Sequence, residues 1–293
     1  MIFCVDGRYV REEEATVSVL DRGFLFGDSV YETVRSHRGR ILFWNEHAAR
    51  LRRSASLLGI EVDWDLVDPL ATLRELLRQN GLENARIRII VTRGMGVVHR
   101  LQGFCPTWVF TIERFTAPDE SVYVNGISAV LVSVVRHAPT CLNPEIKSSN
   151  LLNNVLARRE ALERDAEEGI LLNPKGCVAE GAHSNIFWVA EDGTLRTPSR
   201  AVGILPGITR QKLITIARDG LGMRVEEVEA GPAELDRACE IFLTSTSWEA
   251  LSVSRWNGRT VGAAGAAGVE KGPVARALRA GLQRLYDEPG EAS

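Results

Sequence analysis

The apolar run over residues 127–135 places the strongest constraint on the fold. Its residues, Ile-Ser-Ala-Val-Leu-Val-Ser-Val-Val, do not alternate regularly with polar residues, which is typical of a strand buried on both faces. Residues 169–173 and 184–190 also predict strands, with a turn at residues 174–176 after the first of them. We therefore expect the second half of the chain to be organised around buried strands.

A single lysine stands between this first strand and a predicted helix. Lys147 precedes the helix directly, and Ser148 or Ser149 can cap the first helical turn. A lysine amine is the group that forms a Schiff base with a carbonyl compound, although a lone lysine in a loop is more often a hydrated surface residue. The apolar residues that recur at helical spacing are Leu151, Leu152, Val155, Leu156 and Leu162.

The length and composition indicate a two-domain globular protein. The chain has 293 residues and a mass of 32.3 kDa, and its net charge of -3 gives no reason to expect a nucleic-acid partner. We expect a first domain over residues 1–115, a linker over 116–126 and a second domain over 127–293. The N-terminus has no signal peptide, and no segment could span a membrane.

The cysteine and histidine residues are too scattered for a metal site. Five cysteines lie far apart with no CxxC pair, and the five histidines form no HExxH pattern. We therefore expect a reduced, cytoplasmic protein without a bound metal.

The first half of the chain predicts a sheet with helices beside it. The strand over residues 29–36 alternates, so Tyr31, Thr33 and Arg35 share one face, either a pocket wall or a solvated sheet face. The other predictions are a hairpin over 2–10, strands over 15–20, 85–93 and 107–115, and helices over 45–58, capped by Asn45, and 66–79. A glycine-rich loop over 94–103 carries His99 and Arg100.

Three features of the second half suggest one cofactor. Glu180 lies in a loop with Gly181, where the backbone can approach a ligand closely. The segment 206–209 opens a helix, whose free N–H groups favour a phosphate, and residues 244–247 offer four hydroxyl groups. Lys147 could form an imine, Glu180 could pair with a pyridinium nitrogen, and the two segments could anchor a phosphate. These are the groups that pyridoxal 5'-phosphate requires. Each of these segments could also be an ordinary turn or cap.

The chain also resembles a known family over nearly its whole length. Six motifs occur in the order found in class IV (fold type IV) pyridoxal-phosphate aminotransferases. They are DRGFLFGDSVYETVR, EHAARL, IKSSNLLNNVLARREA, VAEGAHSNIFWV, LPGITR and FLTSTSWE. The resemblance implies an α/β (α+β) fold, with a small N-terminal α/β sandwich domain and a larger C-terminal domain with a β-barrel-like core. It also implies a homodimer with pyridoxal 5'-phosphate at the domain interface, and ping-pong transfer of an amino group between an amino acid and a 2-oxo acid.

The resemblance assigns roles to individual positions. It implies that Lys147 is the Schiff-base lysine and the general base, and that Glu180 pairs with the pyridine nitrogen. It implies phosphate contacts from Arg50, Ile208, Thr209 and Thr246, ring packing by Leu205, and a substrate-lining strand with Tyr31, Thr33 and Arg35.

The substrate remains open between related classes. The sequence Lys147–Leu152 and the VTRG at residues 91–94 resemble the D-amino-acid aminotransferases, whose Arg-x-His carboxylate trap is broken here into Val98-His99-Arg100. His99, Arg100, Arg136 and Arg35 are the candidate carboxylate partners, although His99 and Arg100 could equally be exposed loop residues. Branched-chain L-amino acids and (R)-amines are alternatives, as is 4-amino-4-deoxychorismate lyase activity. A non-catalytic phosphate-binding protein is the alternative outside the enzymes.

Overall fold

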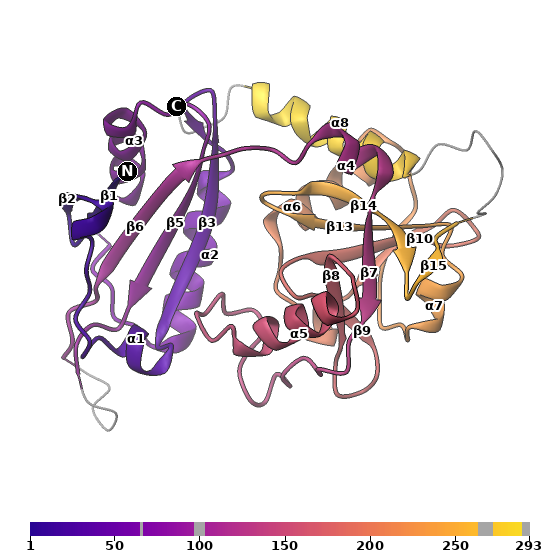
Figure 1. Cartoon of the computed structure of the whole chain (residues 1–293), viewed down its shortest axis with the longest axis horizontal. Coiled ribbons are helices and arrows are strands. Elements are labelled where there is room, and N and C mark those ends of the chain that lie inside the picture. The colour runs from indigo at the N-terminus through magenta and orange to yellow at the C-terminus, as the bar shows by residue number, and fades with distance from the viewer. Residues whose placement is uncertain (65–66, 97–102, 263–271, 289–293) are drawn as a thin grey trace. The chain divides into compact units, whose positions relative to one another are not determined.

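The computed structural model describes residues 1–64, 67–96, 103–262 and 272–288 (Figure 1). These residues form two compact units. The first contains Met1–Thr116 together with Ile146–Asn150, and the second contains Ala117–Glu145 and Leu151–Glu288. Lys147 therefore belongs to the first unit, although it follows the first strand of the second unit in the sequence.

The first unit is a six-stranded sheet in the order β2-β1-β6-β5-β3-β4. Helices α2 and α3 pack against it, and their Leu51 and Leu73 share one apolar core with Val30 and Val34 of β3. The elements are β1 (Ile2–Val5), β2 (Arg8–Arg11), η1 (Glu12–Glu14), α1 (Arg22–Phe26), β3 (Ser29–His37), β4 (Arg40–Ile41), α2 (Trp44–Leu58), α3 (Pro69–Asn80), β5 (Ala85–Thr92) and β6 (Trp108–Arg114).

Local signals set most of these boundaries. Helix α2 ends at Gly59 and α3 at Gly81, and each glycine has a positive φ (63° and 61°) that glycine adopts without steric cost. Asp68 caps α3 by accepting a hydrogen bond from Ala71 N at 3.0 Å. The prediction of Asn45 as the cap of α2 is wrong, because the cap position is Phe43 and the helix already includes Asn45.

The strand predicted over residues 15–20 is also absent from the described structure. Val17, Val19 and Leu20 are exposed, and the segment runs as loop and turn between η1 and α1. The prediction rested on the β-propensity of the residues alone. A strand also needs a partner to complete its backbone hydrogen bonds, and none pairs with this segment among the described residues.

The second unit is built on a nine-stranded sheet. Its order is β12-β11-β10-β13-β14-β7-β8-β9, with β15 paired to β14. Strand β9 also lies close to β10 and β11, so the sheet curls into the expected barrel-like core. The strands are β7 (Ile127–Leu131), β8 (Glu168–Leu172), β9 (Val178–Gly181), β10 (Asn185–Val189), β11 (Leu195–Pro198), β12 (Val225–Val228), β13 (Glu240–Ser245), β14 (Glu249–Trp256) and β15 (Arg259–Thr260).

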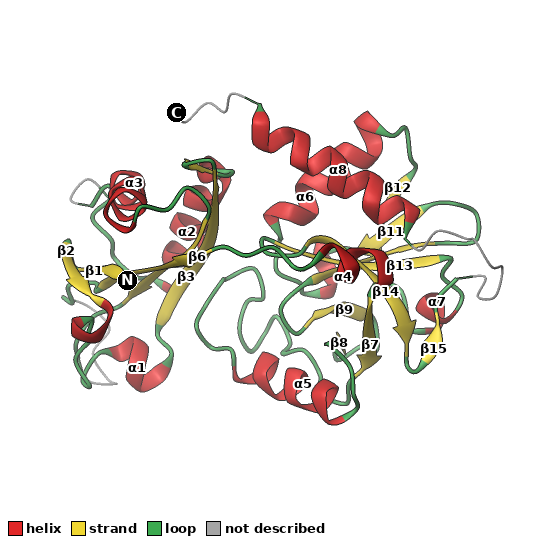
Figure 2. Cartoon of the chain, turned by 45° about the horizontal axis from the view of Figure 1, so that its top comes forward, coloured by secondary structure: helices red, strands yellow, loops and turns green. Residues whose placement is uncertain are grey.

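Helices pack against several strands of this sheet. Helices α6 and α8 contact each other and strands β13 and β14, and α5 contacts β7 and β8 (Figure 2). The helices are α4 (Glu120–Asn125), which falls within the predicted linker, α5 (Leu152–Glu163), η2 (Arg200–Val202), α6 (Ile208–Thr215), η3 (Ile216–Gly220), α7 (Ala233–Asp236) and α8 (Pro273–Asp287). Within the described ranges, no helix is long and apolar enough to cross a membrane.

Helix α5 differs from its prediction at both its start and its buried face. It begins at Leu152 without a side-chain cap, so the capping assigned to Ser148 or Ser149 is wrong. Its buried residues are Ala157 and Ala161, whereas Leu152 and Val155 are 71% and 57% exposed. Small residues face β8 because the helix lies close to that strand: a Cβ added at Gly169 would stand 2.8 Å from Ala157 O.

The predicted strand over residues 127–135 is shorter than expected. Strand β7 ends at Leu131, although Val132 N still donates a hydrogen bond to Ile170 O at 3.0 Å. Val135 is 49% exposed, so the apolar run continues past the buried part of the strand.

Candidate active site

The lysine segment is fixed to strand β3 and helix α2 of the first unit. Tyr31 N donates to Lys147 O at 2.9 Å, and Ser149 N donates to Ser29 O at 3.0 Å. Lys147 N donates to Ser54 Oγ of α2 at 3.2 Å. The segment thus extends the sheet beside the first half of β3, which fixes the backbone from which the Lys147 side chain projects.

The Lys147 amine lies against a tyrosine of the predicted pocket wall. Its Nζ is 4.4 Å from the centre of the Tyr31 ring and 3.5 Å from Tyr31 Oη. The alternation on β3 is confirmed, because Val30 and Val34 belong to the core under α2 and Tyr31, Thr33 and Arg35 occupy the other face. Tyr31 and Arg35 are each only 9% exposed, so this face is not a freely hydrated surface.

Arg88 is a residue of this wall that the sequence reasoning missed. It lies directly opposite Thr33 in the β3–β5 pair, and its Cζ is 3.9 Å from the centre of the Tyr31 ring. Two cations therefore contact one tyrosine, an arrangement that favours an anionic group nearby. The alternation of Arg86, Ile87, Arg88 and Ile89 was the available signal, but only the strand register could place Arg88 beside Tyr31.

Arg50 forms part of a buried charged cluster on the core side of the same strand. Its Nε and Nη2 donate to the two carboxylate oxygens of Glu32 at 2.7 and 2.8 Å, and His47 Nδ1 is 2.7 Å from Glu32 Oε2. Burial alone would raise the pKa of Glu32, but Arg50 and His47 outweigh it and hold that pKa below its usual range. Glu32 was not among the sequence candidates, although it precedes Thr33 in the motif.

The neighbouring His47 is neutral, because burial decides the direction of its pKa shift. Burial lowers the pKa of His47, and the nearby charges of Arg50 and Lys147 lower it further, while Glu32 works against them. The cluster therefore pairs one carboxylate with one guanidinium and keeps the imidazole as a hydrogen-bonding group.

Glu180 is held by three groups within the second unit. Its Oε1 pairs with Arg136 Nη2 at 2.9 Å, and its Oε2 accepts hydrogen bonds from Leu205 N at 3.0 Å and Asn185 Nδ2 at 3.2 Å. Glu180 was expected in a loop but lies on strand β9, and it is 4% exposed. These contacts fix the orientation of the carboxylate, as a partner for a ring nitrogen requires.

Arg136 lies beside this carboxylate, and His137 Nδ1 is 3.4 Å from Arg136 Nη1. Arg136 was a candidate partner for a substrate carboxylate, and here its guanidinium pairs with Glu180 while its buried Nε has no hydrogen-bond partner among the described residues. Burial and the adjacent Arg136 lower the pKa of His137 to about 4, so that imidazole is neutral at pH 7.

The start of helix α6 carries several of the predicted phosphate residues. Ile208 and Thr209 are its first two residues and are 9% and 8% exposed. Their N–H groups come before the first backbone donor of the helix, because the first helical hydrogen bond runs from Gln211 N to Gly207 O. Gly207 is required here, since a Cβ at that position would overlap Asn185 Oδ1. Thr246 follows β13 and is partly buried.

These residues fit a phosphorylated pyridine cofactor. The start of α6 offers backbone donors, and Thr244 Oγ1 is buried without a hydrogen-bond partner in the described structure. Glu180 supplies an oriented carboxylate, and Lys147 supplies an amine on a fixed backbone. No group of three or more His, Cys, Asp or Glu side chains that could hold a metal is found in the described parts of the chain.

The structure thus divides the predicted residues between two sets. Lys147, Tyr31, Thr33, Arg35 and Arg50 belong to the first unit, and Arg136, Glu180, Leu205, Ile208, Thr209 and Thr246 to the second. His99 and Arg100 lie outside the described residues.

Known proteins resemble this chain over most of its length. The family model for class IV amino-transferases matches residues 29–256. A putative branched-chain-amino-acid aminotransferase of Methanocaldococcus jannaschii is 38% identical over 259 residues, 88% of each chain. A D-alanine aminotransferase of Bacillus licheniformis is 33% identical over 279 residues, 95% of this chain and 94% of that protein.

Solved structures show the same fold. The branched-chain amino acid aminotransferase of Escherichia coli has a TM-score of 0.87 at 28% identity, covering 99% of this chain and 97% of that one. A branched-chain amino acid aminotransferase of Thermoproteus uzoniensis, solved with norvaline, has a TM-score of 0.86 at 29% identity, covering 98% and 94%. Another branched-chain enzyme of this fold was solved with pyridoxamine 5'-phosphate. The chain therefore belongs to the class IV aminotransferases, which act with pyridoxal 5'-phosphate.

Proposed function

We propose that this aminotransferase moves an amino group between a D-amino acid and a 2-oxo acid. The Leu151-Leu152 pair that follows the lysine segment carries the proposal, because this sequence resembles the D-amino-acid enzymes rather than the branched-chain ones. The relatives support it too: several D-alanine aminotransferases are 32–34% identical over 94% or more of this chain.

The cofactor supplies an aldehyde that takes up the amino group and a ring that withdraws electrons from the substrate carbon. In this proposal Lys147 Nζ links to the cofactor at rest and moves the proton at the substrate α-carbon. Glu180 keeps the ring nitrogen protonated, and Arg136, Asn185 and Leu205 N keep that carboxylate in place. Leu205 would pack on the ring.

The phosphate is assigned to the start of α6 and to Arg50. Ile208 N, Thr209 and Thr246 would donate to it, with the positive end of the helix dipole favouring its charge. Arg50 would add a guanidinium whose orientation is fixed by Glu32.

The substrate carboxylate is assigned to the cationic wall on β3 and β5. The Tyr31 ring contacts both Arg88 and Lys147. Thr33 and Arg35 follow on the same face of β3. His99 and Arg100 remain candidates for the same role. In this arrangement a carboxylate replaces water beside the guanidinium groups, which orients the α-carbon.

The test is a substrate panel with 2-oxoglutarate and pyruvate as acceptors. We expect kcat/KM for D-alanine to exceed that for L-alanine and L-leucine by at least about a hundredfold, or about 2.7 kcal/mol in transition-state binding. A higher value for L-leucine would instead favour a branched-chain enzyme, the alternative supported by the M. jannaschii relative. A preference for (R)-1-phenylethylamine would indicate an amine aminotransferase.

The lyase alternative is tested separately. Release of pyruvate from 4-amino-4-deoxychorismate without any 2-oxo acid acceptor would favour it, because transamination needs an acceptor to complete its cycle. We further propose a homodimer in the cytoplasm, in keeping with the family resemblance and with five cysteines that are all free thiols.

A further inference from the structure

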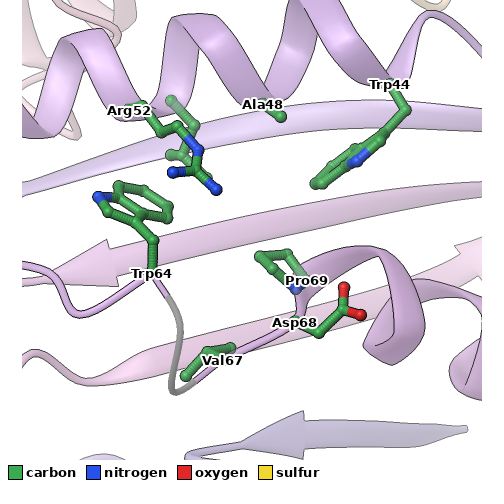
Figure 3. Close-up of a pocket in the computed structure, with 8 residues that line it drawn as sticks. Trp44, Ala48, Arg52, Trp64, Val67, Asp68 and Pro69 are labelled. Carbon is green, nitrogen blue, oxygen red and sulfur yellow. The ribbon is translucent and has the colours of Figure 1, made fainter.

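The first unit contains an open cavity on the core side of its sheet, on the other face from Tyr31 and Arg88. Its volume is about 350 Å³, and it lies between helix α2 and the residues that lead into α3 (Figure 3). The lining residues that define its chemistry are Trp44, Ala48, Arg52, Trp64, Asp68 and Pro69. None of them belongs to the site proposed for the amino transfer.

The aromatic walls of this cavity are held in place by the core. The Trp64 ring meets the buried Trp108 ring edge-on, with 5.5 Å between centroids and an angle of 88°. Trp44 is 9% exposed and packs in the same core as Leu51. Preformed aromatic walls of this kind suit a flat ring, because little side-chain freedom is lost when the ring binds.

The polar groups of the cavity favour an anion. Arg52 stacks on Trp64 with its Cζ 4.7 Å from the ring centre, and Figure 3 shows its guanidinium directed into the space above Trp64. Among the described residues, no carboxylate forms an ion pair with Arg52. Asp68 already accepts the hydrogen bond of Ala71 N as the cap of α3. A ligand carboxylate would therefore find an available guanidinium.

We propose that this cavity binds a small aromatic carboxylate. The ring would lie between Trp44 and Trp64, with Ala48 leaving room for it, and the carboxylate would accept hydrogen bonds from Arg52. The size is suitable, since a dry cavity of about 150 Å³ accepts benzene and this one is larger and open at one side. A free phosphate could pair with Arg52 but would leave the faces of Trp44 and Trp64 without a partner, so an anion that carries a ring fits better.

The test uses 3-phenylpropanoate as the probe and the holoenzyme labelled with 5-fluorotryptophan. Each of the six tryptophans gives one ¹⁹F resonance, which single Trp→Phe variants assign. We expect the probe to shift the Trp44 and Trp64 resonances while those of Trp188, Trp248 and Trp256 in the second unit stay fixed. The neutral 3-phenylpropanamide should bind at least about tenfold more weakly, as expected for the loss of a charge-assisted hydrogen bond.

Three variants make the outcome decisive. Arg52→Gln should weaken binding of the probe at least about tenfold, whereas Arg53→Gln, the adjacent arginine outside the cavity lining, should leave it unchanged. Ala48→Phe should fill the cavity and abolish the shifts, with transaminase activity reporting that the protein is folded. Absence of any shift, shifts that persist in Ala48→Phe, or equal effects of the two arginine variants would each overturn the proposal. A substrate panel that contradicts the D-amino-acid preference would not change the interpretation of these binding results, because the cavity contains no residue of the proposed catalytic site.

Discussion

At the scale of single residues, the sequence identified the groups with a local signature and missed those that depend on pairing. Lys147 and Glu180 stand in recognisable motifs. Arg88 and Asn185 do not, because their importance follows from strand register: Arg88 lies opposite Thr33, and Asn185 donates to the Glu180 carboxylate. The pattern of residues along one strand does not determine how that strand aligns with its neighbour.

Removing the Glu32 carboxylate should destabilise the fold in a pH-dependent way. Glu32→Gln leaves Arg50 buried without its anion, so we expect a loss of about 3 kcal/mol in the free energy of unfolding at pH 7. Urea denaturation measures it. The matched control is Glu113→Gln, which removes an exposed pair with Arg86 and should cost less than about 1 kcal/mol.

The sign of the pH dependence follows from the lowered pKa of Glu32. Burial opposes ionisation, but Arg50 and His47 together bring the folded-state pKa below the ordinary 4.5. The unfolded chain therefore binds the proton at higher pH than the folded chain, so the stabilisation is complete above 4.5 and is lost as the pH falls below it. The wild-type protein should lose more stability than Glu32→Gln between pH 5 and pH 3; equal losses would contradict the account.

Glu180→Gln should separate cofactor binding from chemistry. The amide still accepts the hydrogen bonds of Leu205 N and Asn185 but cannot stabilise a protonated ring nitrogen as an anion does. We expect the purified variant to keep its yellow colour and to lose about a hundredfold or more in kcat. An unchanged kcat would remove Glu180 from the proposed role.

At the scale of elements, the sequence predicted where the helices end better than which face of a helix is buried. Helices α2 and α3 end at Leu58 and Asn80, within one residue of the predicted ends, because the left-handed glycine that follows each helix is a local requirement. The buried face of α5 was wrong because contact with β8 selects small residues, and the larger apolar residues of that helix are exposed. The strand over 15–20 was wrong because propensity cannot supply a pairing partner.

The close approach of α5 to β8 can be measured directly. Gly169→Ala adds a methyl group 2.8 Å from both Ala157 O and Val132 Cγ1, so the helix or the strand must move. We expect a loss of about 1–3 kcal/mol in the free energy of unfolding. Arg159→Ala, which removes only an exposed pair with Glu163, should change it by no more than about 0.5 kcal/mol. Similar losses in both variants would argue against the tight contact.

At the scale of the whole molecule, the path of the chain limits what the sequence can show. A reading in chain order separates residues 1–115 from 127–293, yet Ile146–Asn150 packs with the first unit through the bonds of Tyr31 N and Ser149 N. The family motifs supplied the proposed composition of the site because their order along the chain is visible. Which side chains meet within each unit required the structure.

The proposed homodimer predicts a particle of twice the chain mass of 32.3 kDa. Light scattering on the purified protein measures this mass without reference to shape. A mass equal to one chain, at concentrations where the enzyme is active, would contradict the proposal.

The central proposal is that pyridoxal 5'-phosphate attaches covalently to Lys147. Reduction of the holoenzyme with borohydride, followed by peptide mapping by mass spectrometry, locates that attachment directly. We expect the phosphopyridoxyl group on the peptide that contains Lys147, and neither label nor turnover at this position in Lys147→Ala. Label on another lysine of the native protein, or none at all, would contradict the central claim.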